Sequence, residues 1–174
     1  MTKNILLILS IGLAASALSM QPVLVKATGL SVNSHNTFGV DSVPPSEVMD
    51  VVQIVISATN NFNIESVAGL YTPNAVVADD EPPYSWNGPT AGIQWLNAVE
   101  KACKDLHLTK LKATISPVDI FHQSADNIYL IVPVSYTGLL PGKAKYTAKG
   151  AFTFVLRLVN GKWMIKGQAW MPGK

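Results

Sequence analysis

The stretch from residue 71 to residue 96, YTPNAVVADDEPPYSWNGPTAGIQWL, decides how this chain folds. Near its start, residues 75–78 (AVVA) form an apolar segment that favours a strand. Three consecutive acids follow at 79–81, and then a loop rich in proline and aromatic residues. The sequence NGP at 87–89 turns the chain into a helix. Acids at a strand end beside large aromatic side chains suit a small pocket, which needs apolar walls and a polar group that orients a ligand.

The first 27 residues have the pattern of a secretory signal peptide. Lys3 provides a short basic region, and the apolar segment 5–18 follows it. Small residues then offer two cleavage sites, after Ser19 and after Ala27, and no stop-transfer charges follow. We therefore expect an exported protein, periplasmic or secreted, with an uncleaved N-terminal anchor as the alternative. No later segment is long and apolar enough to span a membrane.

The composition is that of one folded domain after this segment. The chain has 174 residues, of which 48% are hydrophobic and 14% charged, which is enough to fill a core. Residues 28–42 are rich in serine, asparagine and glycine and lack a sustained period. We expect them to form a flexible leader, followed by a single domain at 43–174.

Charge and cysteine content exclude several classes of function. Loss of residues 1–27 removes two of the 13 basic residues and none of the 11 acidic ones, so the mature chain is formally neutral. Without a Lys/Arg cluster, we expect no nucleic-acid partner. Histidine and cysteine do not cluster at metal-ligand spacing and no phosphate-binding loop is present, so we expect no metal and no cofactor. Cys103 falls in an apolar helical stripe, which predicts a buried thiol rather than a reactive one.

The hydrophobic pattern predicts helices first and mostly strands afterwards. Apolar residues recur at helical spacing over about 44–61, 64–70 and 89–106. The predicted strands are 75–78, 110–122 with a break at Ser116-Pro117, 128–138, 146–158 and 162–171. Asn160-Gly161 is a strong hairpin signal between the last two. This order predicts an α+β fold, with three N-terminal helices packed on a curved, mostly antiparallel β-sheet.

The order of elements resembles the NTF2-like, or cystatin-like, cone, the fold of SnoaL-like polyketide cyclases and ketosteroid isomerases. Over residues 51–96 the resemblance to a bacterial ketosteroid isomerase is also local. It includes VVQIVISATNNFNIESVAGLY at 51–71, the Tyr71-x-x-x-Ala75 spacing, and the glycine and alanine positions at the start of the third helix. The rest of the mature domain matches in pattern only. The resemblance implies the fold and leaves the function open, because this superfamily supports many activities.

The resemblance implies a role for Asp79, which falls where these isomerases keep their general-base aspartate. A carboxylate at the mouth of an apolar pocket can move a proton next to a carbonyl group. An ordinary turn acid is the alternative for Asp79. The oxyanion donors are replaced, since Val55 stands at the tyrosine position and Phe154, across a one-residue gap, at the aspartate position. Because one such donor commonly contributes roughly 3 kcal/mol, steroid isomerisation is not expected.

Other side chains of the predicted cone are candidates for the site. Tyr136 shares a strand face with Val132 and is a candidate hydroxyl inside the cone, with a rim position as the alternative. His122 is a candidate acid or base, with a surface position as the alternative. Tyr84 and Trp86 are candidates for a lid, or for packing on the rim or on a partner copy. The expected catalytic residues are Asp79, Tyr136 and His122, and the expected ligand contacts are Val55, Tyr84, Trp86, Val132 and Phe154.

Three functions follow from these patterns. We expect an exported protein that binds a small apolar molecule in its cone and lacks steroid isomerase activity. The first alternative is a SnoaL-like lyase, isomerase or hydrolase that uses Asp79 as general base. The second is a homodimeric interaction module, whose exposed sheet face pairs with itself or with another exported protein.

Overall fold

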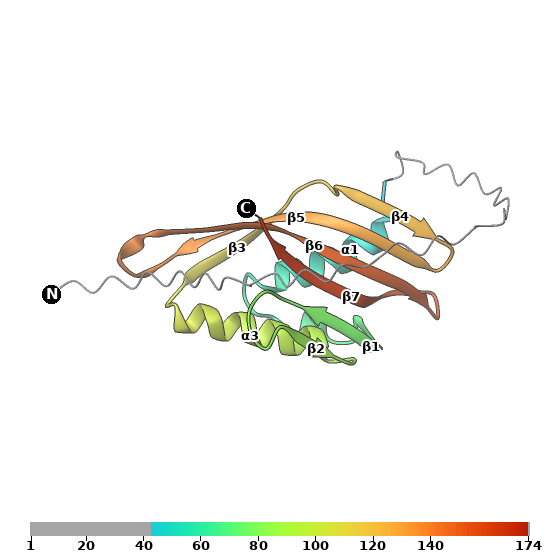
Figure 1. Cartoon of the computed structure of the whole chain (residues 1–174), viewed down its shortest axis with the longest axis horizontal. Coiled ribbons are helices and arrows are strands. Elements are labelled where there is room, and N and C mark those ends of the chain that lie inside the picture. Colours follow the sequence, from blue (N-terminus) through green and yellow to red (C-terminus); the bar gives the residue numbers. More distant parts are fainter. Residues whose placement is uncertain (1–42, 174) are drawn as a thin grey trace, which may run out of the picture. The chain divides into compact units, whose positions relative to one another are not determined.

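The computed structural model describes residues 43–173 (Figure 1). The expected signal peptide (1–27) and leader (28–42) lie outside the described residues. Within the described part, no helix is long and apolar enough to cross a membrane.

Three α-helices of the described part of the chain form the first layer of the domain. They are α1 (Ser46–Ala58), α2 (Ile64–Val67) and α3 (Ala91–Asp105). One face of α1 is buried, with Val48, Val52 and Val55 fully inaccessible to solvent. The Asn63 side chain accepts a hydrogen bond from the backbone N–H of Ser66, which caps α2. All three predicted helices are therefore present, and each is shorter than its predicted range.

Within residues 43–173, seven strands form one sheet. In chain order they are β1 (Tyr71–Ala78), β2 (Ser85–Asn87), β3 (Thr109–Ile115), β4 (Ile120–Ser124), β5 (Asn127–Leu139), β6 (Lys145–Val159) and β7 (Lys162–Pro172). The spatial order is β2-β1-β7-β6-β5-β3, and β4 also pairs with β5. Only β1 and β7 run parallel, so the sheet is mostly antiparallel, as predicted. A short 3-10 helix, Pro141–Lys143, joins β5 to β6.

The predicted break at Ser116-Pro117 separates β3 from β4, and both of these strands pair with β5. The N–H of Ser116 donates to the carbonyl of Pro133 at 2.9 Å, so the break lies opposite Pro133. The N–H and C=O of one strand residue point to the same side, and proline has no N–H. The missing donor of Pro133 therefore faces the interruption, which explains how β5 tolerates a proline near its middle.

The strand β2 is a correction to the sequence analysis, which interpreted the proline- and aromatic-rich segment after the three acids as a loop. Its three residues pair with the end of β1, with Trp86 opposite Val77. Only Trp86 of the three is buried. A strand of this length has too few residues to show the alternation by which strands are recognised.

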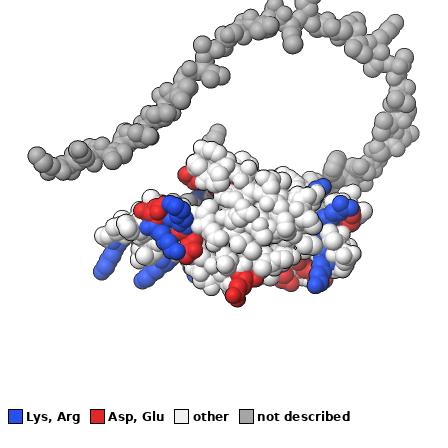
Figure 2. Space-filling view, turned by 90° about the horizontal axis from the view of Figure 1, so that it is seen from below, with Lys and Arg blue, Asp and Glu red and all other residues white. Residues whose placement is uncertain are grey.

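The core lies between the sheet and the helices. Figure 1 shows the long strands β5 and β6 arching above α3. Along β5 the inward side chains alternate with outward ones, and the pairing with β6 brings a second inward row beside them. The buried members of these rows are Ile128, Leu130, Val132, Val134, Phe152, Phe154 and Leu156. Figure 2 shows Lys and Arg beside Asp and Glu near both ends of the described domain, with mainly uncharged surface between them.

Candidate functional site

A cavity of about 570 Å³ lies between the loop after β1, helix α3 and the strands β5 to β7. Its volume is within the range of small-molecule sites. Apolar side chains of α3, such as Ala98 and Val99, form part of the wall. Six aromatic residues also line the cavity: Trp86, Trp95, Tyr136, Tyr146, Phe152 and Trp170. The cavity therefore has the apolar walls that the sequence predicts for a pocket in this region.

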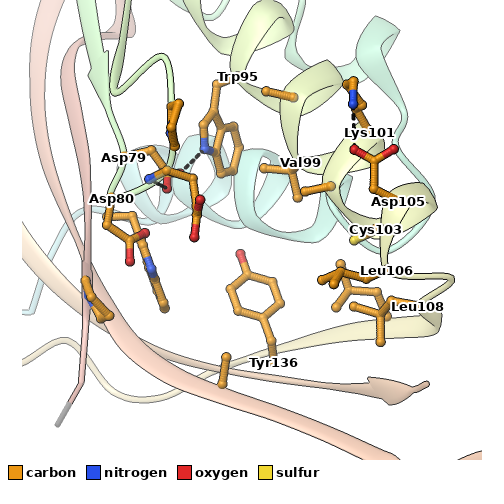
Figure 3. A pocket seen from close by; sticks show the side chains of 18 of the residues that line it. Asp79, Asp80, Trp95, Val99, Lys101, Cys103, Asp105, Leu106, Leu108 and Tyr136 are labelled. Carbon is orange, nitrogen blue, oxygen red and sulfur yellow. Dashed lines mark hydrogen bonds and ion pairs between the residues drawn. The ribbon is translucent and has the colours of Figure 1, made fainter. Parts of the chain in front are cut away.

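Asp79 places a carboxylate in this cavity (Figure 3). It is the first residue after β1, and its backbone N–H donates to the carbonyl of Tyr84 at 3.0 Å, which closes the loop. The indole Nε1 of Trp95 donates a hydrogen bond of 2.6 Å to Oδ2 of Asp79. Because Trp95 is buried, its N–H needs an acceptor inside the protein. The carboxylate is thus held from both its backbone and its side chain.

The surroundings of Asp79 raise its pKa above the ordinary value of 3.8. Burial is the main cause, and the neighbouring Asp80 raises the pKa further. The hydrogen bond from Trp95 acts in the opposite direction, as does a weak contact of 3.4 Å from the backbone N–H of Glu81 to Oδ1. A half-buried carboxylate with a raised pKa is a better proton acceptor than one in water.

Tyr136 lies on the same cavity, and Figure 3 shows its hydroxyl pointing inward to the space beside Asp79. It follows the inward row of β5, as predicted, and pairs with Ala148 of β6. Burial raises the pKa of Tyr136 above its usual range and the charge of Asp79 adds to this, while a hydrogen bond with Thr59 lowers it. The phenol therefore stays protonated at neutral pH and can donate a hydrogen bond.

Four aromatic rings make a continuous wall. Trp95 packs edge-on against Phe152 with ring centroids 5.6 Å apart, and Phe152 lies 4.8 Å from Trp170. Trp170 in turn packs edge-on against Tyr136 at 5.7 Å. Neither Trp95 nor Trp170 is among the candidate site residues of the sequence analysis. Their inward positions can be predicted from the periodicity of the sequence. The presence of a cavity beside them cannot be predicted in this way.

The structure brings three of the eight predicted site residues to the cavity: Asp79, Tyr136 and Trp86. Val55, Val132 and Phe154 are fully buried among other core side chains and do not line it. They lie on the inward faces, as the pattern implies, but the space beside them is filled.

The two remaining predicted residues are on the surface. His122 is exposed on β4, where its ring stacks on Tyr129 with centroids 6.5 Å apart. Tyr84 is 59% exposed at the tip of the loop after β1, and neither residue lines the cavity. His122 lies away from the cavity because its position in the register of β4 directs its side chain outward. Tyr84 lies away from it because it belongs to the turn before β2.

Cys103 also lines the cavity and is buried, as predicted. Burial raises the pKa of its thiol, and the nearby Glu100 raises it further. A thiol with a raised pKa is a weak nucleophile at neutral pH. Among residues 43–173, no group of three or more His, Cys, Asp or Glu side chains could hold a metal ion.

Comparison with known proteins gives matches by structure. No protein-family model and no curated protein matches the chain. The structure is similar to the hexachlorocyclohexane dehydrochlorinase LinA-type3 from Novosphingobium barchaimii LL02, with a TM-score of 0.63 and 14% identity over 74% of this chain and 86% of that one. It is also similar to an NTF2-like superfamily protein from Salmonella enterica serovar Typhimurium LT2, with a TM-score of 0.60 and 11% identity over 74% and 90%.

A third similar structure is a protein assigned as a scytalone dehydratase from Novosphingobium aromaticivorans DSM 12444. Its TM-score is 0.60, with 11% identity over 74% of this chain and 83% of that one. At such low identity these likenesses concern the fold alone. The chain therefore has the NTF2-like, cystatin-like fold that the resemblance implies, with the α+β order of elements that the sequence pattern predicts.

Proposed function

We propose that this chain is an exported protein whose NTF2-like domain binds a small, largely apolar molecule in the cavity beside α3. The observation that carries the proposal is the cavity of about 570 Å³, lined by six aromatic residues and one half-buried carboxylate. Apolar walls provide most of the binding free energy in such sites, and a few polar groups orient the ligand. Asp79 and Tyr136 are those polar groups.

Native mass spectrometry of the exported, tag-free protein tests this proposal. A small molecule that is present under native conditions and leaves on mild denaturation is the expected result. Ala148→Phe should abolish the retained mass, because Ala148 lines the cavity and a phenyl ring would fill part of it. Thr147→Phe is the matched control, since Thr147 is the exposed neighbour on the other face of β6. Retention of the same molecule by both variants would place the ligand elsewhere.

A second candidate function is supported by the arrangement of Asp79, Trp95 and Tyr136. With Oδ2 bonded to Trp95, the Oδ1 atom of Asp79 is available to accept a proton from a bound molecule. The Tyr136 hydroxyl, on the same cavity, can donate to an oxygen of that molecule. We propose a lyase, isomerase or hydrolase reaction with Asp79 as general base. Steroid isomerisation is not included, because Val55 and Phe154 are buried apolar residues without a donor.

Substrate screening with purified variants tests this second candidate. For any substrate found, Asp79→Asn should remove turnover, and Tyr136→Phe should lower kcat by about 10² to 10³. His122→Gln is the control and should leave kcat unchanged, because His122 lies outside the cavity. Unchanged turnover in Asp79→Asn would exclude the general-base role.

A further inference from the structure

The cavity lining carries more acids than bases. Its charged residues are Asp79, Asp80, Glu81, Asp105, Lys101 and Lys149. On α3, Lys101 and Asp105 form an ion pair of 2.5 Å and are both exposed. Figure 3 shows this pair on the other side of the cavity from Asp79 and Asp80. The other three acids, Asp79, Asp80 and Glu81, have no lysine of the described part of the chain paired with them in this way. They lie together at one end of the cavity, in the loop after β1.

The positive charge of Lys149 does not neutralise the acids of the loop after β1. Side chains of a strand alternate between its two faces, and Ala148 and Phe152 line the cavity from β6. By this alternation the ammonium of Lys149 belongs to the opposite face of β6, where the residue is exposed. Its backbone carbonyl accepts a hydrogen bond of 2.7 Å from the backbone N–H of Gly173.

Among the described residues, no cationic side chain forms an ion pair with the carboxylate of Asp79. The ion pairs between described residues join Lys101 to Asp105, Lys104 to Glu100, and Arg157 to Asp126, and none includes Asp79, Asp80 or Glu81. Trp95 donates to Oδ2, Oδ1 receives a 3.4 Å contact from the backbone N–H of Glu81, and the neighbouring Asp80 carboxyl raises the pKa of Asp79 through a side-chain hydrogen bond and through its charge. A positive group beside Oδ1 would compensate for both the burial of Asp79 and its repulsion by Asp80.

Aromatic rings face the same space. The face of an aromatic ring attracts a cation that lies within about 6 Å of its centroid. The rings of Trp95, Phe152, Trp170 and Tyr136 pack against one another and line the same cavity as Asp79. A carboxylate beside an aromatic wall suits a protonated amine on an apolar body, whereas a carboxylate or phosphate ligand would be repelled.

We propose that the ligand of this cavity is a small organic amine, whose ammonium donates to Oδ1 of Asp79 while its apolar body packs on the aromatic wall. The proposal rests on the binding function above and identifies the chemical class of the ligand. Asp80, exposed at the mouth, adds attraction for the approaching cation, which salt would screen.

Three probes of one shape and different charge test this inference by isothermal titration calorimetry at neutral pH. They are 2-naphthylmethylamine, 2-naphthylmethanol and 2-naphthoic acid. The amine should bind at least about tenfold more tightly than the alcohol, which is about 1.4 kcal/mol, and the acid should bind most weakly. Asp79→Asn should remove the preference for the amine, so that the amine and the alcohol bind this variant with affinities within about twofold of each other. In the control Asp119→Asn, an exposed acid that does not line the cavity, the preference should persist.

The possible results separate the two proposals. Equal affinities for amine and alcohol, or tighter binding of the acid, would overturn the amine assignment and leave a cavity that binds apolar molecules. The same preference in Asp79→Asn as in the parent protein would also overturn it. Failure of all three probes to bind, together with an empty native mass spectrum, would overturn both proposals.

Discussion

The indole Nε1 of Trp95 and the carboxylate Oδ2 of Asp79 lie 2.6 Å apart, and their hydrogen bond joins helix α3 to the end of β1. The two residues are 16 positions apart in the sequence. The bond leaves one oxygen of Asp79 for a ligand, since the other is engaged. It also makes the position of Asp79 depend on the packing of α3.

Trp95→Phe should raise the pKa of Asp79, because the substitution removes a donor that stabilises the charged carboxylate. A hydrogen bond to a charged group is worth about 1.5–3 kcal/mol, so a loss of stability of this order is also expected. The measurement is a pH titration of the Asp79 carboxyl carbon by NMR. Trp86→Phe is the matched control, because Trp86 lines the same cavity and has no hydrogen bond to Asp79. An equal pKa in both variants would contradict the prediction.

Asp79→Asn should make the protein slightly more stable at neutral pH. The pKa of Asp79 is higher in the folded state than the ordinary 3.8, so the folded protein holds this proton more tightly than the unfolded chain. The group's contribution to stability is therefore greatest below about pH 4 and is lost as the pH rises through the folded pKa. The gain at pH 7 should be at most about 1 kcal/mol, because the carboxyl is partly solvated. Urea unfolding at both pH values measures it, and a variant less stable at pH 7 than at pH 3, relative to the parent, would refute it.

Tyr71→Phe should destabilise the core by about 1–3 kcal/mol. The hydroxyl of Tyr71 donates to Oε1 of Gln168 at 2.5 Å, and both residues are buried. The Nε2 atom of Gln168 already has no hydrogen-bond partner, so the substitution would leave the whole amide unsatisfied. The double variant Tyr71→Phe/Gln168→Met should recover at least about 1 kcal/mol of the summed single losses, because it removes both polar groups. Additive losses in chemical denaturation would show that the pair is not coupled.

Gly92→Ala should destabilise the domain by about 1–3 kcal/mol or more. A Cβ at position 92 would lie only 2.0 Å from the ring of the buried Tyr71, which is held by its hydrogen bond. Gly167→Ala is the control, because its Cβ would meet Val155 at an ordinary 3.6 Å. The two denaturation midpoints should differ clearly, and equal midpoints would mean that Tyr71 can move aside.

Expression of the full chain in a bacterial host should yield an exported form shorter than 174 residues. Its intact mass should correspond to cleavage after Ser19 or after Ala27. Both are small residues that follow the apolar segment, which is the pattern of a signal cleavage site. Lys3→Glu should slow export, since it reverses the charge of the basic region. An uncleaved chain that stays in the membrane fraction would support the N-terminal anchor instead.

Local pattern was sufficient to predict the type and order of nearly all elements. The spacing of Val48, Val52 and Val55 depends only on the helical repeat, and the alternation along β5 depends only on the pleat. The Asn160-Gly161 turn likewise joins β6 and β7, as predicted. These features are set by backbone geometry within a few residues, so they can be read without knowledge of the tertiary fold. The three-residue strand β2 was not predicted from the sequence, because its structure depends on pairing with β1.

The sequence by itself therefore determined the α+β order of elements, the inward face of each long strand, and the acidic group after β1. Only the tertiary structure decided which inward side chains border empty space. Phe152 and Phe154 share one face of β6, yet Phe152 lines the cavity and Phe154 lies in the filled core. Periodicity fixes the direction of a side chain but not what lies opposite it. The Trp95–Asp79 bond and the cavity beside it result from the packing of α3 against the sheet, and no local pattern encodes that contact.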